Sequence, residues 1–68
     1  LEQKVNVNLQ DKLGNTALMI ASGQNYQGVI KLLIQSGADV NIKNNKGNTA
    51  LTVASGRNYR EIALLLLQ

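Results

Sequence analysis

The candidate hydroxyl nucleophiles in this sequence are its three serines, and the chain contains no histidine or cysteine that could activate them. Ser22, Ser36 and Ser55 each stand at the end of a predicted helix. A serine hydroxyl becomes a nucleophile when a neighbouring base removes its proton, and the imidazole that usually does so is missing. We therefore interpret the three serines as structural.

The four acidic residues also lack a chemical pattern. None of Glu2, Asp11, Asp39 and Glu61 is paired at a spacing typical of a catalytic dyad or a metal site. Asp39 belongs to a turn, and Glu61 stands in the first turn of a predicted helix, where negative charge is favourable. We predict no enzymatic activity, no metal and no cofactor for this segment. The prediction does not extend to a catalytic domain attached outside it.

Nucleic acid is a poor candidate partner. Seven Lys and Arg against four Asp and Glu give a net charge of +3, which mildly favours acidic partners but falls short of a nucleic-acid footprint. Tyr26 and Tyr59 are the only aromatic residues, and we expect each ring to pack beside a turn between helices rather than to stack on bases. The turns "SGQN" and "SGRN" do not match a phosphate-binding loop.

No stretch approaches the run of about 20 apolar residues that spans a bilayer. The first ten residues also lack the apolar region of a signal peptide. We expect a soluble protein with no membrane partner, located in the cytoplasm or nucleus. Because the first residue is Leu rather than Met, we expect the natural N-terminus to lie upstream.

The chain repeats itself with a period of 33 residues. When residues 5–35 are placed over residues 38–68, 15 of the 31 pairs are identical, where unrelated sequences would match at about two. The identities concentrate between positions 14 and 26, where "GNTALMIASGQNY" recurs as "GNTALTVASGRNY". This pattern indicates a duplicated scaffold with variable positions around it.

Each unit is predicted to contain two short helices and a hairpin-like loop. Thr16 and Thr49 precede "ALMIAS" and "ALTVAS" as helix caps, and the Gly-Asn turns that follow end these inner helices. The run "YQGVIKLLIQS" has an apolar stripe wide enough for burial against two neighbours, and Gly37 ends it. "ADVNIKNNKGN" and its counterpart at residues 5–15 have no helical period and should form extended hairpin-like loops.

The segments "GNTALMIAS", "VIKLLIQSGADVN", "GNTALTVAS" and "EIALLLLQ" resemble the ankyrin repeat over nearly the whole chain. The resemblance implies an all-α solenoid of stacked helix-turn-helix units joined by β-hairpin-like loops. It places the tail of a preceding repeat at residues 1–4, the first repeat at 5–37 and a C-terminally incomplete second repeat at 38–68. We expect these residues to be part of a longer array, with a small unit that covers its ends by self-association as the alternative.

The sequence departs from the family pattern at several positions. The proline and histidine of the family's T-P-L-H motif are replaced by Ala17 and Met19 in the first unit and by Ala50 and Thr52 in the second. The opening aspartate is kept as Asp11 but is Asn44 in the second unit. Loss of the histidine network implies below-average stability, while the asparagines that replace the Gly-His turn still tolerate a left-handed backbone.

The resemblance implies a non-catalytic module for protein–protein interaction, in which hairpin tips and inner helices form a rigid concave surface. The implied partner-binding positions are Gln10, Lys12, Leu13, Asn15, Met19, Gln24, Lys43, Asn45, Lys46, Asn48, Thr52 and Arg57. Four of them are basic and none is acidic, so an acidic segment of another protein is the sharper hypothesis for the partner, beside a purely solubilising role of the lysines. Self-association through the apolar ends of the stack is the alternative function.

Overall fold

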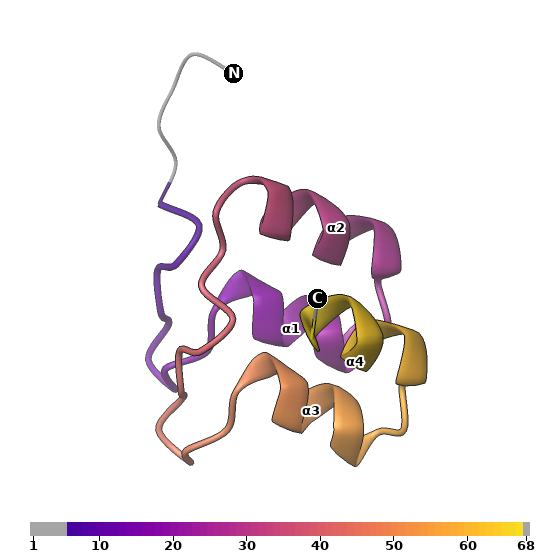
Figure 1. The fold of residues 1–68 in the computed structure, drawn as a ribbon. Coiled ribbons are helices and arrows are strands. Elements are labelled where there is room, and N and C mark those ends of the chain that lie inside the picture. The colour runs from indigo at the N-terminus through magenta and orange to yellow at the C-terminus, as the bar shows by residue number, and fades with distance from the viewer. Residues whose placement is uncertain (1–5, 68) are drawn as a thin grey trace.

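Four helices in two pairs make up the structure, a computed structural model that describes residues 6–67 (Figure 1). They are α1 (Ala17–Gln24), α2 (Gln27–Gln35), α3 (Ala50–Gly56) and α4 (Arg60–Leu67), and the described residues form no strand. The predicted all-α stack of helix-turn-helix units is confirmed. The predicted tail of a preceding repeat, residues 1–4, and the outer limits of both repeats at residues 5 and 68 lie outside the described residues.

The inner helices begin and end at the residues that the sequence predicts. The Oγ1 atoms of Thr16 and Thr49 accept hydrogen bonds of 3.3 Å from the backbone N–H groups of Met19 and Thr52. Beyond the helix ends, Asn25 and Asn58 adopt left-handed backbone angles with φ of 62° and 63°. Because asparagine tolerates this conformation better than most residues, the chain reverses there without a glycine.

The loops before the inner helices have the same backbone hydrogen bonds in both units. Asp11 N–H donates to Asn15 O, and Asn44 N–H donates to Asn48 O, each at 2.9 Å. Gly14 and Gly47 donate back to the carbonyls of Asp11 and Asn44, also at 2.9 Å. Each loop is therefore a tight hairpin-like turn without a strand ladder, as predicted.

The core lies where the two helix pairs meet. α1 packs against α3, and α2 packs against α4, so the four helices stack in two layers (Figure 1). Ala21, Ala50 and Ala54 are at most 4% exposed, and such small side chains allow neighbouring helices to approach closely. The fully buried aliphatic side chains are Leu18, Ile30 and Ile62. Leu18 therefore points inward as expected, whereas its counterpart Leu51 is only half-buried.

The outer helix α2 is buried on one side only. Ile30 is fully buried where α2 packs against α1 and α4, but Val29 and Leu32 of the predicted stripe remain 44% and 64% exposed. The expectation that both tyrosines pack beside a turn is likewise correct for Tyr59, which packs against the core. Tyr26, by contrast, is 54% exposed.

The two hairpin glycines have the same conformation but different surroundings, which gives a matched test of how closely the units pack. A Cβ atom on Gly14 would lie 2.8 Å from Asn45 N, whereas one on Gly47 would meet nothing within 4 Å. Gly47→Ala should lower the free energy of unfolding by about 1 kcal/mol through its left-handed backbone. Gly14→Ala should lower it by roughly a further 1–3 kcal/mol through overpacking, as urea denaturation followed by circular dichroism would measure. Equal losses would contradict the close approach of the hairpins.

Candidate protein-binding surface

The two hairpins, residues 6–15 and 38–48, lie beside each other at one end of the helices (Figure 1). Asn45 binds the first hairpin twice, through its backbone N–H to Leu13 O and through Nδ2 to Lys12 O, both at 2.9 Å. Gln10 Nε2 donates to Gly14 O at 2.8 Å and to Lys43 O at 3.0 Å. These bonds join the two hairpins into one edge, which we call the hairpin surface.

Asn44 replaces the family's aspartate in the second unit and forms the same turn. Asp11 Oδ1 accepts hydrogen bonds from the N–H groups of Leu13 and Asn15 at 3.0 and 2.8 Å. Asn44 Oδ1 accepts the two equivalent bonds in the second hairpin, each at 2.9 Å. Its Nδ2 also donates to Asn15 Oδ1 at 2.9 Å. The amide therefore closes its own turn and adds a contact between the units.

A hollow of about 290 Å³ opens on the hairpin surface. Its lining residues are Leu13, Asn15, Asn44, Asn45, Lys46 and Asn48. All of them except Asn44 belong to the predicted partner-binding positions. The lining combines amide groups, one ammonium group and one leucine, which is a chemistry that suits a carboxylate or a backbone carbonyl beside an aliphatic group.

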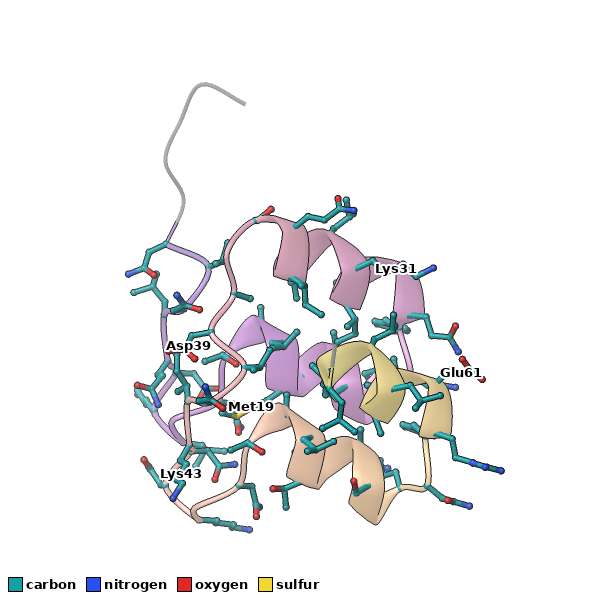
Figure 2. The ribbon with its side chains drawn as sticks, in the orientation of Figure 1. Met19, Lys31, Asp39, Lys43 and Glu61 are labelled. Atoms are coloured by element: carbon teal, nitrogen blue, oxygen red, sulfur yellow. The ribbon has the colours of Figure 1, made fainter. Side chains whose placement is uncertain are left out.

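The basic residues of the predicted site fall into two groups. Lys12, Lys43 and Lys46 are exposed on the hairpins, and Figure 2 shows Lys43 at the hairpin end of the molecule, far from Lys31 and Glu61. Arg57 follows the last residue of α3, about 10 Å from the hairpin end of that helix, since each helical residue rises about 1.5 Å. Its guanidinium lies over Gly23 of α1. Arg57 and the exposed Gln24 thus occupy the far end of the inner helices.

Acidic groups reduce the positive charge near the three lysines. Asp11 and Asp39 are exposed residues of the same two hairpins. Each carboxylate accepts backbone hydrogen bonds, in the case of Asp39 one of 2.9 Å from Asn41 N–H. The predicted positions contain no acid themselves, but the hairpin surface as a whole retains only a small positive excess.

The prediction that Met19 lies on the accessible surface is wrong. Its side chain is 3% exposed and belongs to the core, and Figure 2 shows it directed into the body of the molecule. The equivalent residue Thr52 is exposed, and its hydroxyl lies 3.1 Å from that of Thr49. Met19 is covered because the second helix pair lies over it. The sequence did contain a signal for this burial, because Met19 is apolar whereas the equivalent Thr52 is polar. The family pattern, which counts this position among the binding residues, argued against it.

The remaining predicted positions are accessible. Gln10, Lys12, Leu13, Gln24, Lys43, Asn45, Lys46, Thr52 and Arg57 are exposed, while Asn15 and Asn48 are half-buried. Gln10 and Asn45 nevertheless use their amide groups to join the hairpins. The family resemblance placed these two residues on the surface, but it could not reveal that they link the two hairpins.

Comparison with known proteins identifies the stack. A family model described as ankyrin repeats (3 copies) matches residues 1–68. The chain belongs to the ankyrin repeat family. A search of curated proteins found no match. Among solved structures, the chain is similar to the crystal structure of EF0377, an ankyrin repeat protein, with 38% sequence identity and a TM-score of 0.91 over 96% of this chain. The chain spans 35% of the length of that protein.

Ankyrin repeats are generally protein–protein interaction modules, and the family is typically non-catalytic. Within residues 6–67, no group of three or more acidic side chains could hold a metal ion. No helix of the described residues has the length and apolar character needed to cross a membrane.

The different burial of Met19 and Thr52 predicts different effects of truncation. Met19→Ala removes a buried thioether side chain and should lower the free energy of unfolding by about 2–4 kcal/mol. Thr52→Ala, at the equivalent exposed position, should change it by less than about 0.5 kcal/mol. Thermal or urea unfolding of both variants would measure the difference. Similar small effects would show that Met19 is accessible after all.

The hairpin links can be tested at equivalent positions of the two units. The double variant Gln10→Ala and Asn45→Ala loses the amide bonds between the hairpins and should be less stable by about 1–2 kcal/mol, given a net value of about 1 kcal/mol per hydrogen bond. The matched double variant Lys43→Ala and Lys12→Ala removes the residues one period away, whose side chains are exposed, and should be close to neutral. Urea unfolding would compare the two, and equal stabilities would argue against the links.

Proposed function

We propose that this ankyrin repeat segment is a non-catalytic binding module whose hairpin surface receives an acidic, extended segment of another protein. The observation that carries the proposal is the hollow between the hairpins, together with the lysines around it. A solvent-exposed groove with fixed donors and a basic rim favours carboxylate side chains by charge and by hydrogen bonding.

The Nδ2 groups of Asn44 and Asn45 already donate within the hairpins, which leaves the amide of Asn15 as the donor that the hydrogen bonds orient. Asn15 Oδ1 is already occupied as the acceptor of the bond from Asn44 Nδ2, so Asn15 offers its own N–H groups to a ligand. Asn48 is half-buried in the same lining, and Lys46 adds an ammonium group at the rim. A carboxylate has only acceptor atoms, and so it matches this set of donors better than an amine or a guanidinium would.

The hairpin surface is preorganised for binding. The hydrogen bonds from Gln10 and Asn45 fix the two hairpins relative to each other, so little conformational entropy is lost when a segment binds across them. Leu13 is 65% exposed at the edge of the hollow and supplies an apolar contact for an aliphatic side chain of the partner.

The proposal includes the absence of catalysis. Ser22 is fully buried, and its hydroxyl donates a 2.7 Å hydrogen bond to Leu18 O, which is the structural role expected of it. The carboxylates of Asp11 and Asp39 are likewise used by backbone N–H groups of their own turns. Self-association, the second hypothesis for function, concerns the ends of the stack rather than the hairpin surface.

A labelled poly-glutamate peptide at low salt tests this proposal, with a poly-glutamine peptide as the uncharged probe. Fluorescence anisotropy should show binding of the glutamate peptide alone. Lys43→Glu with Lys46→Glu should weaken it by about tenfold or more, since each reversal replaces an attraction with a repulsion worth several tenths of a kcal/mol or more.

The control carries the same change of net charge on the outer helices. Lys31→Glu with Arg60→Glu should leave the affinity within about threefold, because both residues lie on outer helices, away from the hairpins. If both double variants lose binding equally, the peptide responds to net charge and not to the hairpin surface. Failure of the wild-type chain to bind poly-glutamate would also count against the proposal.

A further inference from the structure

Two pairs of equivalent positions line the hollow on the hairpin surface, and only one pair differs in residue type. Asn15 and Asn48 are equivalent and identical, so they offer the same amide on both hairpins. Leu13 of the first hairpin is equivalent to Lys46 of the second. The two halves of the hollow therefore differ in the kind of side chain that Leu13 and Lys46 can bind.

The charged residues around the hollow are also distributed unequally between the hairpins. Residues 10–15 contain one acid and one base, whereas residues 43–48 contain two lysines and no acid. Asp11 Oδ1 accepts a hydrogen bond of 3.0 Å from Leu13 N–H, so a carboxylate lies beside this leucine. The equivalent acceptor beside Lys46 is a neutral amide. A carboxylate of a partner is therefore repelled near Leu13 and attracted near Lys46.

The contacts between the hairpins limit the distance from Leu13 to Lys46. Asn45 N–H donates to Leu13 O at 2.9 Å, and Lys46 follows Asn45 by one Cα–Cα step of about 3.8 Å. With standard bond lengths, the Cα atoms of Leu13 and Lys46 are then at most about 11 Å apart. Neighbouring helices pack with their axes about 8–10 Å apart, which gives a similar value for equivalent residues of two stacked units.

An extended segment that crosses both hairpins fits this distance with residues two positions apart. Each residue of an extended chain advances about 3.3 Å, and only alternate side chains point to the same face. Residues i and i+2 thus lie about 7 Å apart on one face, whereas residues i and i+4, about 13 Å apart, overshoot the distance. The flexible side chain of Lys46 and that of a glutamate cover the few ångströms that remain.

We propose that the hairpin surface recognises a two-part element, in which an aliphatic side chain contacts Leu13 and a glutamate two residues away contacts Lys46. This pattern rests on the proposed function, since it requires an acidic extended segment at the same surface, and it specifies what such a segment must carry. The hollow of about 290 Å³ suits so short an element, because small-ligand pockets begin at about 300 Å³. Either order of the two residues satisfies the pattern, because a segment can cross the hairpins in either direction.

A labelled peptide with one leucine between two runs of four glutamates tests the aliphatic contact. Fluorescence anisotropy at low salt should show that it binds about fivefold more tightly than poly-glutamate of the same length, since the leucine buries apolar surface against Leu13. Leu13 is 65% exposed and so has this surface to offer. The Leu13→Ala variant should lose the advantage of the leucine and keep its affinity for poly-glutamate.

Two isomers of this peptide test the spacing at constant net charge. In one, glutamine replaces both glutamates that are two residues from the leucine, and in the other it replaces both glutamates that adjoin it. The first isomer should bind about threefold more weakly than the second, because it lacks the carboxylate that reaches Lys46. The Lys46→Ala variant should bind both isomers equally. Lys43→Ala is the matched control, since it removes a lysine of the same hairpin that does not line the hollow, and it should preserve the difference.

The possible results separate this pattern from the proposed function. If poly-glutamate binds but the leucine gives no advantage, or gives the same advantage in Leu13→Ala, the pattern is overturned and the proposed function stands. Isomers that bind equally to the wild-type chain, or that still differ in Lys46→Ala, overturn the pattern as well. Failure of every acidic peptide to bind overturns both. Circular dichroism checks that each variant is folded, and Leu13→Ser or Lys46→Gln replaces one that is not.

Discussion

The close approach of α1 and α3 is the constraint on which the rest of the structure depends. A short helix pair has too little surface to enclose its own inner helix, and this chain has no disulfide or histidine-bound metal to compensate. Ala50 and Ala54 bring the second inner helix near enough to bury Leu18 and Met19 of the first. The stability of each unit is therefore largely the stability of the seam that it shares with its neighbour.

The helix spacing also determines how the hairpins meet. Because α1 and α3 lie close together, the loops that lead into them are held within hydrogen-bonding distance, and Asn45 N–H reaches Leu13 O at 2.9 Å. There is no room at that point for a side chain on Gly14. The hairpin surface is thus rigid as a consequence of packing between helices, although its own residues are almost all polar.

Local signals were sufficient to predict the helices and turns from the sequence. The threonine caps, the left-handed asparagines and the glycine after α2 each act within a few residues of their own position, and the structure has them where they were expected. The environment of a side chain could not be predicted in this way, because it depends on which neighbour lies beside it. Tyr26 and Tyr59 share nearly the same local sequence, and yet one is exposed and the other packs against the core.

The candidate site was predictable to a similar degree. Family positions identified five of the six residues that line the hollow, but the burial of Met19 and the links from Gln10 and Asn45 depend on contacts between units. The separation of Arg57 from the three lysines has another cause. Arg57 follows the last residue of α3, whereas the lysines stand on the hairpins, at the other end of the inner helices. A count of basic residues does not reveal this separation.

The division between constant and variable positions separates the residues that hold the scaffold together from those that vary on the hairpin surface. Residues that form the seam are apolar or small in both units. The hairpin tips take no part in that packing, and so Lys12 and Asn45, or Leu13 and Lys46, can differ at equivalent positions without cost to the core. Under the proposed function, recognition at the hairpins is therefore set by individual substitutions, whereas packing along the seam follows from the repeat itself. A change that improves packing along the seam would therefore strengthen the fold without altering the residues at the hairpin tips.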